Sequence, residues 1–336
     1  MVQEIINSTH LPWPTEWPEI FGRTAPLVVE IGFGNGEFLL HTARQHPEWN
    51  LIGVEISLPS LRKAAKKVAN ACLTNVRIVQ GDAQLLLWAL CRPQTISGLF
   101  INFPDPWPKA GHVSRRLISD DFLTLAATRL RPAAFLDIAT DHPDYQEWVI
   151  EHLARTPYFE NRLPDVGMYI LSDPGRVVTK YEEKARHEGR MPFYFKWQRN
   201  EKPAPDLFAV PEVVEMPHVI FDAPVDLNEI AARFEPMEFG HDDLLVRMSD
   251  VLISSREPTL IVETYVKERP LSQRVGLFIR QRNTGDYVVG LHELGFPRPT
   301  LGIQFAIHQL VKWLSTLYPD LQITRSTLSE KVSQEI

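Results

Sequence analysis

Residues 27–39, LVVEIGFGNGEFL, decide the fold of this 336-residue chain. The first five residues are apolar apart from one glutamate, a composition typical of a buried strand. Gly32, Gly34 and Gly36 then form a turn, and residues 36–45 predict a helix. Glycines at this point let a nucleotide-like ligand approach the backbone, although an ordinary strand-to-helix turn would use them too. The stretch therefore predicts the first βα unit of an α/β fold.

Strands and helices continue to alternate as far as residue 141. The expected strands are 50–56, 76–82, 98–103 and 134–141, and the expected helices are 57–71, 84–91 and 119–130. The helix at 57–71 is amphipathic, with a solvated basic face at Arg62–Lys67. Such alternation predicts right-handed crossovers and a Rossmann-like parallel sheet that helices cover on both faces.

The sequence predicts a first domain at 1–200, a linker at 201–217 and a second, smaller domain at 218–336. Residues 1–25 hold three prolines and are expected to form an irregular arm on the first domain. The linker holds four prolines, which favour a semi-rigid segment. Beyond it, strands are expected at 243–254, 259–266, 274–282 and 286–294, followed by an amphipathic helix at 300–318. This order predicts an α+β accessory domain, an antiparallel meander with a terminal helix, whose role the sequence leaves open.

Composition excludes several other classes of protein. Hydrophobic residues make up 44% and charged residues 23%, as expected for a globular chain with a substantial core. Two cysteines, Cys72 and Cys91, are too few for a disulfide scaffold or a cysteine-built zinc site. We find neither a signal-peptide pattern nor an apolar run long enough to span a bilayer, so we expect a cytoplasmic protein.

The net charge of −7 is unevenly distributed. Residues 1–200 hold 22 basic and 22 acidic side chains, whereas residues 201–336 hold 13 basic and 20 acidic ones. The acidic excess therefore belongs to the C-terminal part. A neutral first domain can still present a basic face, so the total charge is compatible with an RNA partner.

Three acids end consecutive predicted strands: Glu30, Glu55 and Asp82. A single acid at a strand end is often only solvated, but ligands of such sheets bind beyond the carboxyl ends of the strands. An ammonium for Glu30, ribose hydroxyls for Glu55 and an exocyclic amine for Asp82 together describe S-adenosylmethionine. A dinucleotide fits less well, because Glu37 would oppose its pyrophosphate.

The fourth strand runs into a proline-rich loop, FPDPWPKAGHVSRR, at residues 103–116. Proline fixes φ and removes a backbone donor, so the loop is stiff and presents the Asp105 carboxylate beside a basic segment. In this layout the loop faces the methyl group, and Asp105 is the predicted catalytic residue. Trp107 either stacks on a substrate base or packs under the loop. The alternative for the whole segment is a rigid structural turn with solvated charges.

Six segments together carry a family resemblance: VVEIGFGNGEFL, IGVEIS, GDA, NFPDPWPKAGHVSRRL, ATD and TKYE. Over about residues 25–200 the chain resembles the bacterial tRNA (guanine-N7-)-methyltransferases. The resemblance implies the Rossmann-like fold of class I S-adenosylmethionine-dependent methyltransferases, with S-adenosylmethionine as cofactor. It also implies tRNA as partner and substrate, methylated at N7 of a guanosine in the variable loop. RPAA at 131–134 departs from the family's glycine pair, and residues 201–336 have no counterpart in the typical shorter member.

The residues and the resemblance together assign the site. The predicted cofactor-binding residues are Glu30, Gly32, Gly34, Gly36, Glu55 and Asp82. The predicted substrate-binding residues are Lys109, Arg115, Arg116, Asp141, Thr179, Lys180, Tyr181 and Glu182. No metal is expected, because N7 of guanine has an in-plane lone pair and needs no base. Asp105 would position the ring and stabilise the cationic product.

Three other functions share parts of this pattern. A methyltransferase acting on a small molecule, or on another RNA, would use the same cofactor acids. A nicotinamide-dependent oxidoreductase would use the same glycine loop. A non-catalytic RNA-binding protein would tolerate loss of the cofactor acids, which distinguishes it from the enzymes.

Overall fold

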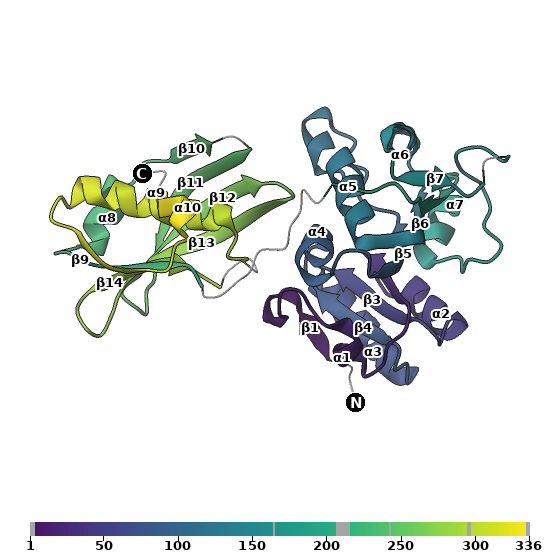
Figure 1. The fold of residues 1–336 in the computed structure, drawn as a ribbon, viewed down its shortest axis with the longest axis horizontal. Coiled ribbons are helices and arrows are strands. Elements are labelled where there is room, and N and C mark those ends of the chain that lie inside the picture. The colour runs from purple at the N-terminus through teal and green to yellow at the C-terminus, as the bar shows by residue number, and fades with distance from the viewer. Residues whose placement is uncertain (1–3, 164, 206–215, 242, 294–296, 334–336) are drawn as a thin grey trace. The chain divides into compact units, whose positions relative to one another are not determined.

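The computed structural model describes residues 4–163, 165–205, 216–241, 243–293 and 297–333 (Figure 1). The chain forms two compact units, Met1–Val210 and Pro211–Ile336. Each unit has its own sheet and its own hydrophobic core, and each is described by itself. None of the helices in the described ranges combines the length and the apolar character that a membrane span requires.

An eight-stranded sheet forms the centre of the first unit. Its strands are β1 (Ile5–Asn7), β2 (Leu27–Ile31), β3 (Asn50–Glu55), β4 (Val76–Gln80), β5 (Ile96–Asn102), β6 (Leu130–Thr140), β7 (Phe159–Asn161) and β8 (Phe193–Arg199). They lie in the order β1-β4-β3-β2-β5-β6-β8-β7. Strands β1 to β6 are parallel, but β8 runs antiparallel to both β6 and β7. The predicted sheet was parallel throughout and lacked β7 and β8, and β8 makes this edge of the sheet antiparallel.

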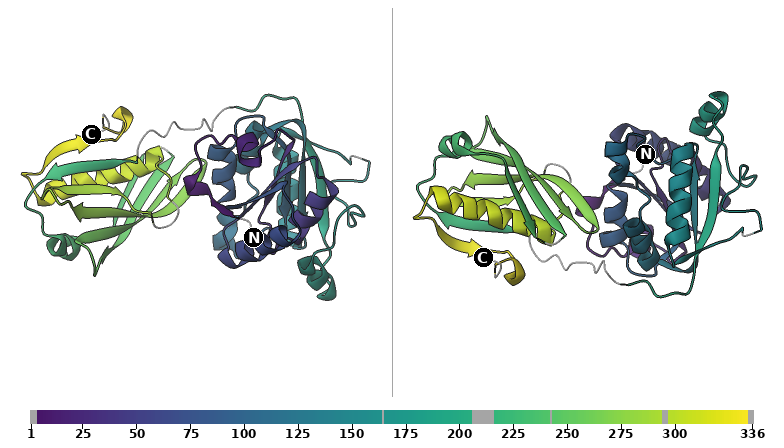
Figure 2. Two further views of the ribbon diagram at one scale, coloured as in Figure 1. Left: turned by 90° about the horizontal axis from the view of Figure 1, so that it is seen from below. Right: turned by 90° about the horizontal axis from the view of Figure 1, so that it is seen from above.

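Helices cover both faces of this sheet (Figure 2). They are α1 (Trp17–Phe21), α2 (Glu37–Gln45), α3 (Leu58–Asn70), α4 (Ala83–Leu85), α5 (Asp120–Arg129), α6 (Pro143–Arg155) and α7 (Lys180–His187). Short 3-10 helices lie at Ser8–His10 and Ala110–Arg115, and a π-helical segment lies at Leu86–Leu90. Most of these positions agree with the predicted helices; α6 and α7 were not predicted.

Residues 1–25 are not the irregular arm that their prolines predicted. Ile5 of β1 lies opposite Ile78 of β4 and extends the sheet. Helix α1 buries Trp17, whose indole nitrogen donates to the carbonyl oxygen of Leu90 at 3.0 Å. A three-residue strand and a five-residue helix are too short to show a periodic pattern, so tertiary contacts decide their structure.

Helices α2 and α3 pack together beside the glycine turn. Phe38 of α2 is buried in one cluster with Leu61 and Val68 of α3, as their amphipathic patterns predicted. Lys67 differs from the solvated basic face that was expected, because its ammonium donates to the carbonyl oxygen of Asn35 at 2.9 Å. Helix α3 therefore helps to fix the turn that follows β2.

The second unit contains a seven-stranded antiparallel sheet. Its strands are β9 (His218–Asp222), β10 (Met237–His241), β11 (Leu244–Ile253), β12 (Thr259–Glu268), β13 (Leu271–Gln281), β14 (Tyr287–Leu291) and β15 (Gln322–Ser326). Its helices are α8 (Leu227–Arg233), α9 (Leu301–Leu317) and α10 (Glu330–Ser333). The strand order is β10-β11-β12-β13-β14-β9-β15, so the expected meander is present in β10 to β14.

Helix α9 covers one face of this second sheet and buries Ile303, Ile307 and Leu310 in the core (Figure 2). It is not terminal, as the sequence had suggested, because β15 follows it and pairs with β9. Every residue of β15 is exposed, so its sequence lacks the apolar alternation that marks a strand. Residues 206–215 of the predicted linker lie outside the described residues.

The glycine turn generates a stability prediction. Gly36 has a φ of 76°, and a Cβ added there would lie 2.8 Å from the Cβ of Ala64, whereas Gly32, at φ 67°, has nothing within 4 Å. The left-handed backbone alone costs a side chain roughly 1–2 kcal/mol, and overpacking adds about 1–3 kcal/mol. We expect Gly36→Ala to lower the free energy of unfolding by at least about 1 kcal/mol more than Gly32→Ala in urea denaturation. Equal decreases in the free energy of unfolding for the two variants would mean that α2 moves away from α3 without a cost in free energy.

Candidate functional site

A cavity of about 530 Å³ opens at the carboxyl ends of β2, β3, β4 and β5. Four acids line it, one from the end of each strand or the loop after it: Glu30, Glu55, Asp82 and Asp105. Because parallel strands end at the same edge of a sheet, residues far apart in sequence meet here. The cavity also brings together Gly32, Gly34, Trp107, Arg115 and Thr179. Within the described residues, no group of three or more His, Cys, Asp or Glu side chains is placed to hold a metal ion.

Glu30 is the most deeply buried of the four acids, with 2% of its surface exposed. Its Oε1 accepts a hydrogen bond from the Asn102 side-chain amide at 3.0 Å, but its buried Oε2 has no partner in the described part of the chain. Burial raises the pKa of this carboxyl to about 7, although the Asn102 hydrogen bond and the Arg176 charge oppose the rise. An unsatisfied buried carboxylate oxygen fits a cationic donor such as an ammonium.

Glu55 connects the two loops on either side of the cavity. Its Oε2 accepts from the backbone amide of Gly34 at 3.1 Å. Its Oε1 accepts from the amides of Ile56 and Ser57 at 2.8 and 3.0 Å. A carboxylate has about four acceptor positions and three are occupied here, so Oε2 can accept one further hydrogen bond, which suits a hydroxyl donor.

Asp82 follows β4 and caps α4, where its Oδ1 accepts from the backbone amide of Leu85 at 3.0 Å. Its side chain is exposed within the cavity. The cap fixes the direction of the carboxylate while leaving acceptor positions for a ligand amine.

The proline loop begins where β5 ends and contains two residues in strained backbone conformations. Phe103 has a φ of 49° and Trp107 a φ of 41°, a region that large side chains rarely occupy. Between them, Asp105 is exposed and lines the cavity. Strain of this kind persists only when neighbouring groups hold the backbone in place, and it clusters at functional sites.

The two neighbouring arginines of this loop have different environments. Arg115 is exposed and its guanidinium lies 5.1 Å from the centre of the Trp107 ring. Arg116 has only 9% of its surface exposed, and it lies 5.5 and 4.9 Å from the rings of Tyr145 and Trp148. Its Nε donates to the carbonyl oxygen of Pro106 at 2.9 Å. The structure therefore disagrees with the prediction that Arg116 binds a tRNA phosphate, because Arg116 supports the loop from inside.

Trp107 lines the cavity and also contacts the loop, so both predicted roles have some structural basis. Its ring is half-buried and meets the His112 ring edge-on, with the centroids 5.7 Å apart. Lys109 is exposed on the same loop but is not among the described lining residues, and neither is Gly36, which is buried against α3. Asp141 is also outside the lining and forms an ion pair with Arg190.

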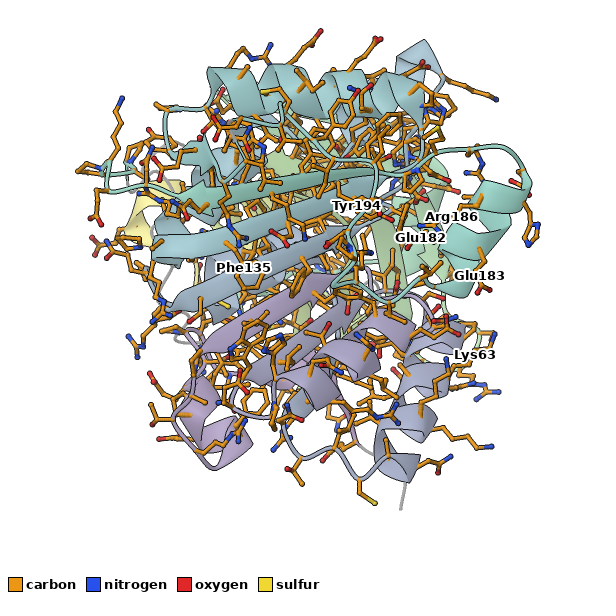
Figure 3. All side chains as sticks on the ribbon, turned by 90° about the vertical axis from the view of Figure 1, so that its right-hand side faces the viewer. Lys63, Phe135, Glu182, Glu183, Arg186 and Tyr194 are labelled. Carbon is orange, nitrogen blue, oxygen red and sulfur yellow. The ribbon has the colours of Figure 1, made fainter. Side chains whose placement is uncertain are left out.

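The TKYE segment begins helix α7, and its residues take different roles. Thr179 lines the cavity, and its Oγ1 accepts from the Glu182 amide at 3.3 Å. Glu182 is 1% exposed, accepts a hydrogen bond from the Tyr194 hydroxyl and pairs with Arg186 at 3.0 Å (Figure 3). The expectation that Glu182 meets tRNA is therefore not supported, since its carboxylate is already buried and paired. The side chains of Lys180 and Tyr181 lie outside the described part of the structure.

Arg176 is a residue of this region that the sequence did not single out. It lies just before TKYE, and its guanidinium pairs with Glu182 at 3.8 Å. A single arginine in a loop with glycine and proline carries no recognisable motif, so only the structure identifies it.

Comparison with known proteins is consistent with this site. Residues 24–194 match the model of a family described as a putative methyltransferase. A tRNA (guanine-N(7)-)-methyltransferase of Thermus thermophilus is 30% identical over 308 residues, which cover 89% of this chain and 92% of that protein. The chain belongs to the tRNA (guanine-N7-)-methyltransferase family. Its first unit has the Rossmann-like fold of class I S-adenosylmethionine-dependent methyltransferases, which confirms the predicted fold class.

Two further members of this family differ in how much of the chain they match. A relative from Deinococcus radiodurans is 33% identical over 294 residues, 86% of this chain and 89% of its own length. A relative from Thermotoga maritima is 41% identical over 181 residues, 54% of this chain and 56% of its own length. The Thermus and Deinococcus alignments are longer than the first unit, which ends at Val210, so both reach into the second unit. Some family members therefore share the additional module.

The contrast between the two loop arginines generates the second prediction. Arg116→Ala removes a buried hydrogen bond and two ring contacts, so we expect it to lower the free energy of unfolding by about 1–3 kcal/mol. Arg115→Ala, the matched control at an exposed position, should change it by less than about 0.5 kcal/mol. Equilibrium denaturation of both variants measures the difference. The assignment of Arg116 as a support of the loop would be lost if the two variants were equally stable.

Proposed function

We propose that this chain transfers the methyl group of S-adenosylmethionine to N7 of a guanosine in the variable loop of tRNA. Family membership gives the enzyme class, the cofactor and the reaction at guanine N7 of tRNA, which are the terms in the relatives' names. The variable loop is a finer assignment that rests on the resemblance of the sequence motifs. The observation that carries the proposal is the set of four acids that meet in one cavity at the carboxyl ends of β2 to β5.

The cavity residues fit the cofactor group by group. The unpartnered Oε2 of Glu30 would accept from the ammonium, and Glu55 from the ribose hydroxyls. Asp82 would accept from the adenine amine, and Gly32 and Gly34 would let the ligand approach the backbone. When bound, the cofactor supplies an electrophilic methyl group on a sulfonium.

Asp105 is the proposed catalytic residue. N7 of guanine carries an in-plane lone pair and no proton, so positioning of the ring is the main requirement. A carboxylate on a stiff loop can accept from the guanine edge, and it stabilises the positive charge that develops on the ring. The hydrogen bond from Arg116 helps to hold that loop in shape, including the strained left-handed backbone at Phe103 and Trp107.

The remaining predicted residues divide into tRNA contacts and supports. Lys109 and Arg115 are exposed cations on the proline loop and are suited to phosphates. Thr179 lines the cavity and would contact the substrate nucleotide. Asp141 would also contact the substrate nucleotide if the ion pair between Asp141 and Arg190 opened. Lys180 and Tyr181 keep the substrate role that the resemblance gives them. Reaching a base within folded tRNA requires splaying it from its neighbours, and Trp107, which lines the cavity, would stack on it.

The third prediction tests Asp105. We expect Asp105→Asn to bind S-adenosylmethionine as the wild type does, because the loop shape survives, yet to lower kcat by roughly 100-fold or more. Labelled methyl transfer to unmodified tRNA, with mapping of the methylated base, measures turnover and also tests the variable-loop assignment.

A suitable control for that experiment is Asp144→Asn, which changes an exposed acid in the first turn of α6, outside the cavity lining. It should leave turnover unchanged. Near-normal turnover by Asp105→Asn would contradict the catalytic role of Asp105 and leave the proline loop with a structural role alone.

We further propose that the second unit is a separately folded accessory that supplies no catalytic group. All the described residues that line the cavity lie between Glu30 and Thr179. The second unit has a hydrophobic core of its own, built between its sheet and α8 and α9. A module with an independent core can be removed without opening the core of its neighbour.

The fourth prediction is that a fragment of residues 1–205 folds, binds S-adenosylmethionine and methylates tRNA with a kcat/KM similar to that of the full chain. The cut follows residue 205 because Arg199 donates to the carbonyl oxygen of Lys202 at 2.6 Å, a contact worth keeping. Calorimetry and methyl transfer, performed on the fragment and the full chain in parallel, provide the comparison. A folded fragment that binds the cofactor but no longer methylates tRNA would show that the second unit takes part in substrate handling.

A further inference from the structure

Arg176 lies in a cage of aromatic rings beside the cofactor cavity. Its side chain is 5% exposed, and its guanidinium carbon lies 4.3 Å from the centre of the Phe38 ring. The rings of Phe103 and Tyr194 are 5.7 and 5.4 Å away. These rings come from α2, the proline loop and β8, so one side chain joins three separate elements. Phe38 and Phe103 also line the cavity, whereas Arg176 contacts their rings and is not itself among the described lining residues.

The buried charge of Arg176 is only partly compensated. Its partner Glu182 is 3.8 Å away, too far for a hydrogen bond, and Glu182 also pairs with Arg186. In the described part of the chain, Nε and Nη2 of Arg176 are buried and make no hydrogen bond. Burying a cation without full compensation costs free energy, which a role of the charge in the site would explain.

The charge of Arg176 acts electrostatically on Glu30, a lining residue of the same cavity whose ring neighbours Phe38 and Phe103 contact Arg176. The positive charge of Arg176 favours the ionised carboxylate, while the negative charge of Glu55 on β3 disfavours it. Asn102 on β5 contributes a neutral hydrogen bond, and Asp82 and Asp105 are further acids of the same cavity. Arg176 is the only cation among the groups that act on Glu30 in the described part of the structure.

We propose that Arg176 is a positioning residue for the cofactor, which holds Phe38 and Phe103 at the cavity and keeps Glu30 negatively charged for the cofactor's ammonium. The inference rests on the proposed function, because it requires Glu30 to be the ammonium acceptor. It adds a residue to which the predicted motifs gave no role. It also gives the buried Glu182 of the TKYE segment a task, since Glu182 anchors Arg176 from the opposite side.

The test compares Arg176→Gln with Arg186→Gln. Both arginines pair with Glu182, but Arg186 has an exposed side chain and does not act on Glu30. The dissociation constant of S-adenosylhomocysteine, which carries the same ammonium, would be measured by calorimetry from about pH 6 to pH 8.5 on the full chain. Dividing each variant's constant by the wild-type constant at the same pH cancels the titration of the ligand.

The expected result follows from the direction of the pKa change. Loss of Arg176 raises the pKa of Glu30 above its value of about 7, so the carboxyl is neutral over a wider range. At about pH 6 the Arg176→Gln variant should bind roughly tenfold more weakly than the wild type, if the pKa rises by about one unit. The ratio should fall as the pH rises to about 8.5, where both proteins hold Glu30 ionised, and any remainder that does not change with pH measures the support lost by Phe38 and Phe103. Arg186→Gln should give a ratio near one throughout.

Two further variants distinguish a failure of the Arg176 inference from a failure of the Glu30 assignment. Arg176→Lys retains the charge and should keep the wild-type pH dependence; it also serves if Arg176→Gln does not fold. A ratio that is the same at every pH, or a wild-type affinity at pH 6, would overturn the inference. Glu30→Gln should lose affinity at pH 8.5, and if it does not, the assignment of Glu30 fails rather than that of Arg176.

Discussion

The burial of the Glu30 carboxylate is the constraint on which the rest of the site depends. Strand β2 lies between β3 and β5, so the acid at its end is surrounded by protein and its pKa is raised to about 7. A buried carboxylate costs free energy unless polar or charged partners satisfy it. Asn102 satisfies one oxygen, and the other stays open toward a ligand. A cationic donor would satisfy this oxygen and lower the cost of burying the carboxylate, which is the basis of the proposed ammonium contact.

The proline loop meets a second requirement of the proposed reaction. It holds the Asp105 carboxylate in a fixed position while the guanine ring becomes positively charged. Three prolines limit the backbone, but two of its residues still adopt left-handed conformations that need external support. Arg116 gives that support by packing on Tyr145 and Trp148 and donating to Pro106. The neighbouring Arg115 is exposed, as its proposed contact with the substrate requires. Two adjacent arginines thus have different environments, and only the buried one supports the loop.

Sequence reasoning predicted the parts of the molecule that local pattern determines. Apolar runs and glycines gave the βα units of the first unit, and the topology of such units brought Glu30, Glu55 and Asp82 together. It did not predict β1, because a three-residue strand has no periodicity, and it did not predict β8, whose antiparallel place at the sheet edge depends on pairing with β6 and β7. Arg116 shows the same limit, since the rings that bury it come from α6, about 30 residues later in the chain.

The exposed cations of the two units differ in whether they have carboxylate neighbours. In the second unit, exposed arginines of the sheet have carboxylate neighbours: Arg247 pairs with Glu238 at 2.6 Å and Arg274 with Glu263 at 3.8 Å. In the first unit, Lys109 and Arg115 have no carboxylate within ion-pair distance among the described residues. Unpaired cations attract phosphates, whereas paired ones in an acidic module largely cancel. Among the described residues, the unpaired cations of the proline loop are therefore better suited to an electrostatic contact with tRNA than the paired arginines of the second unit.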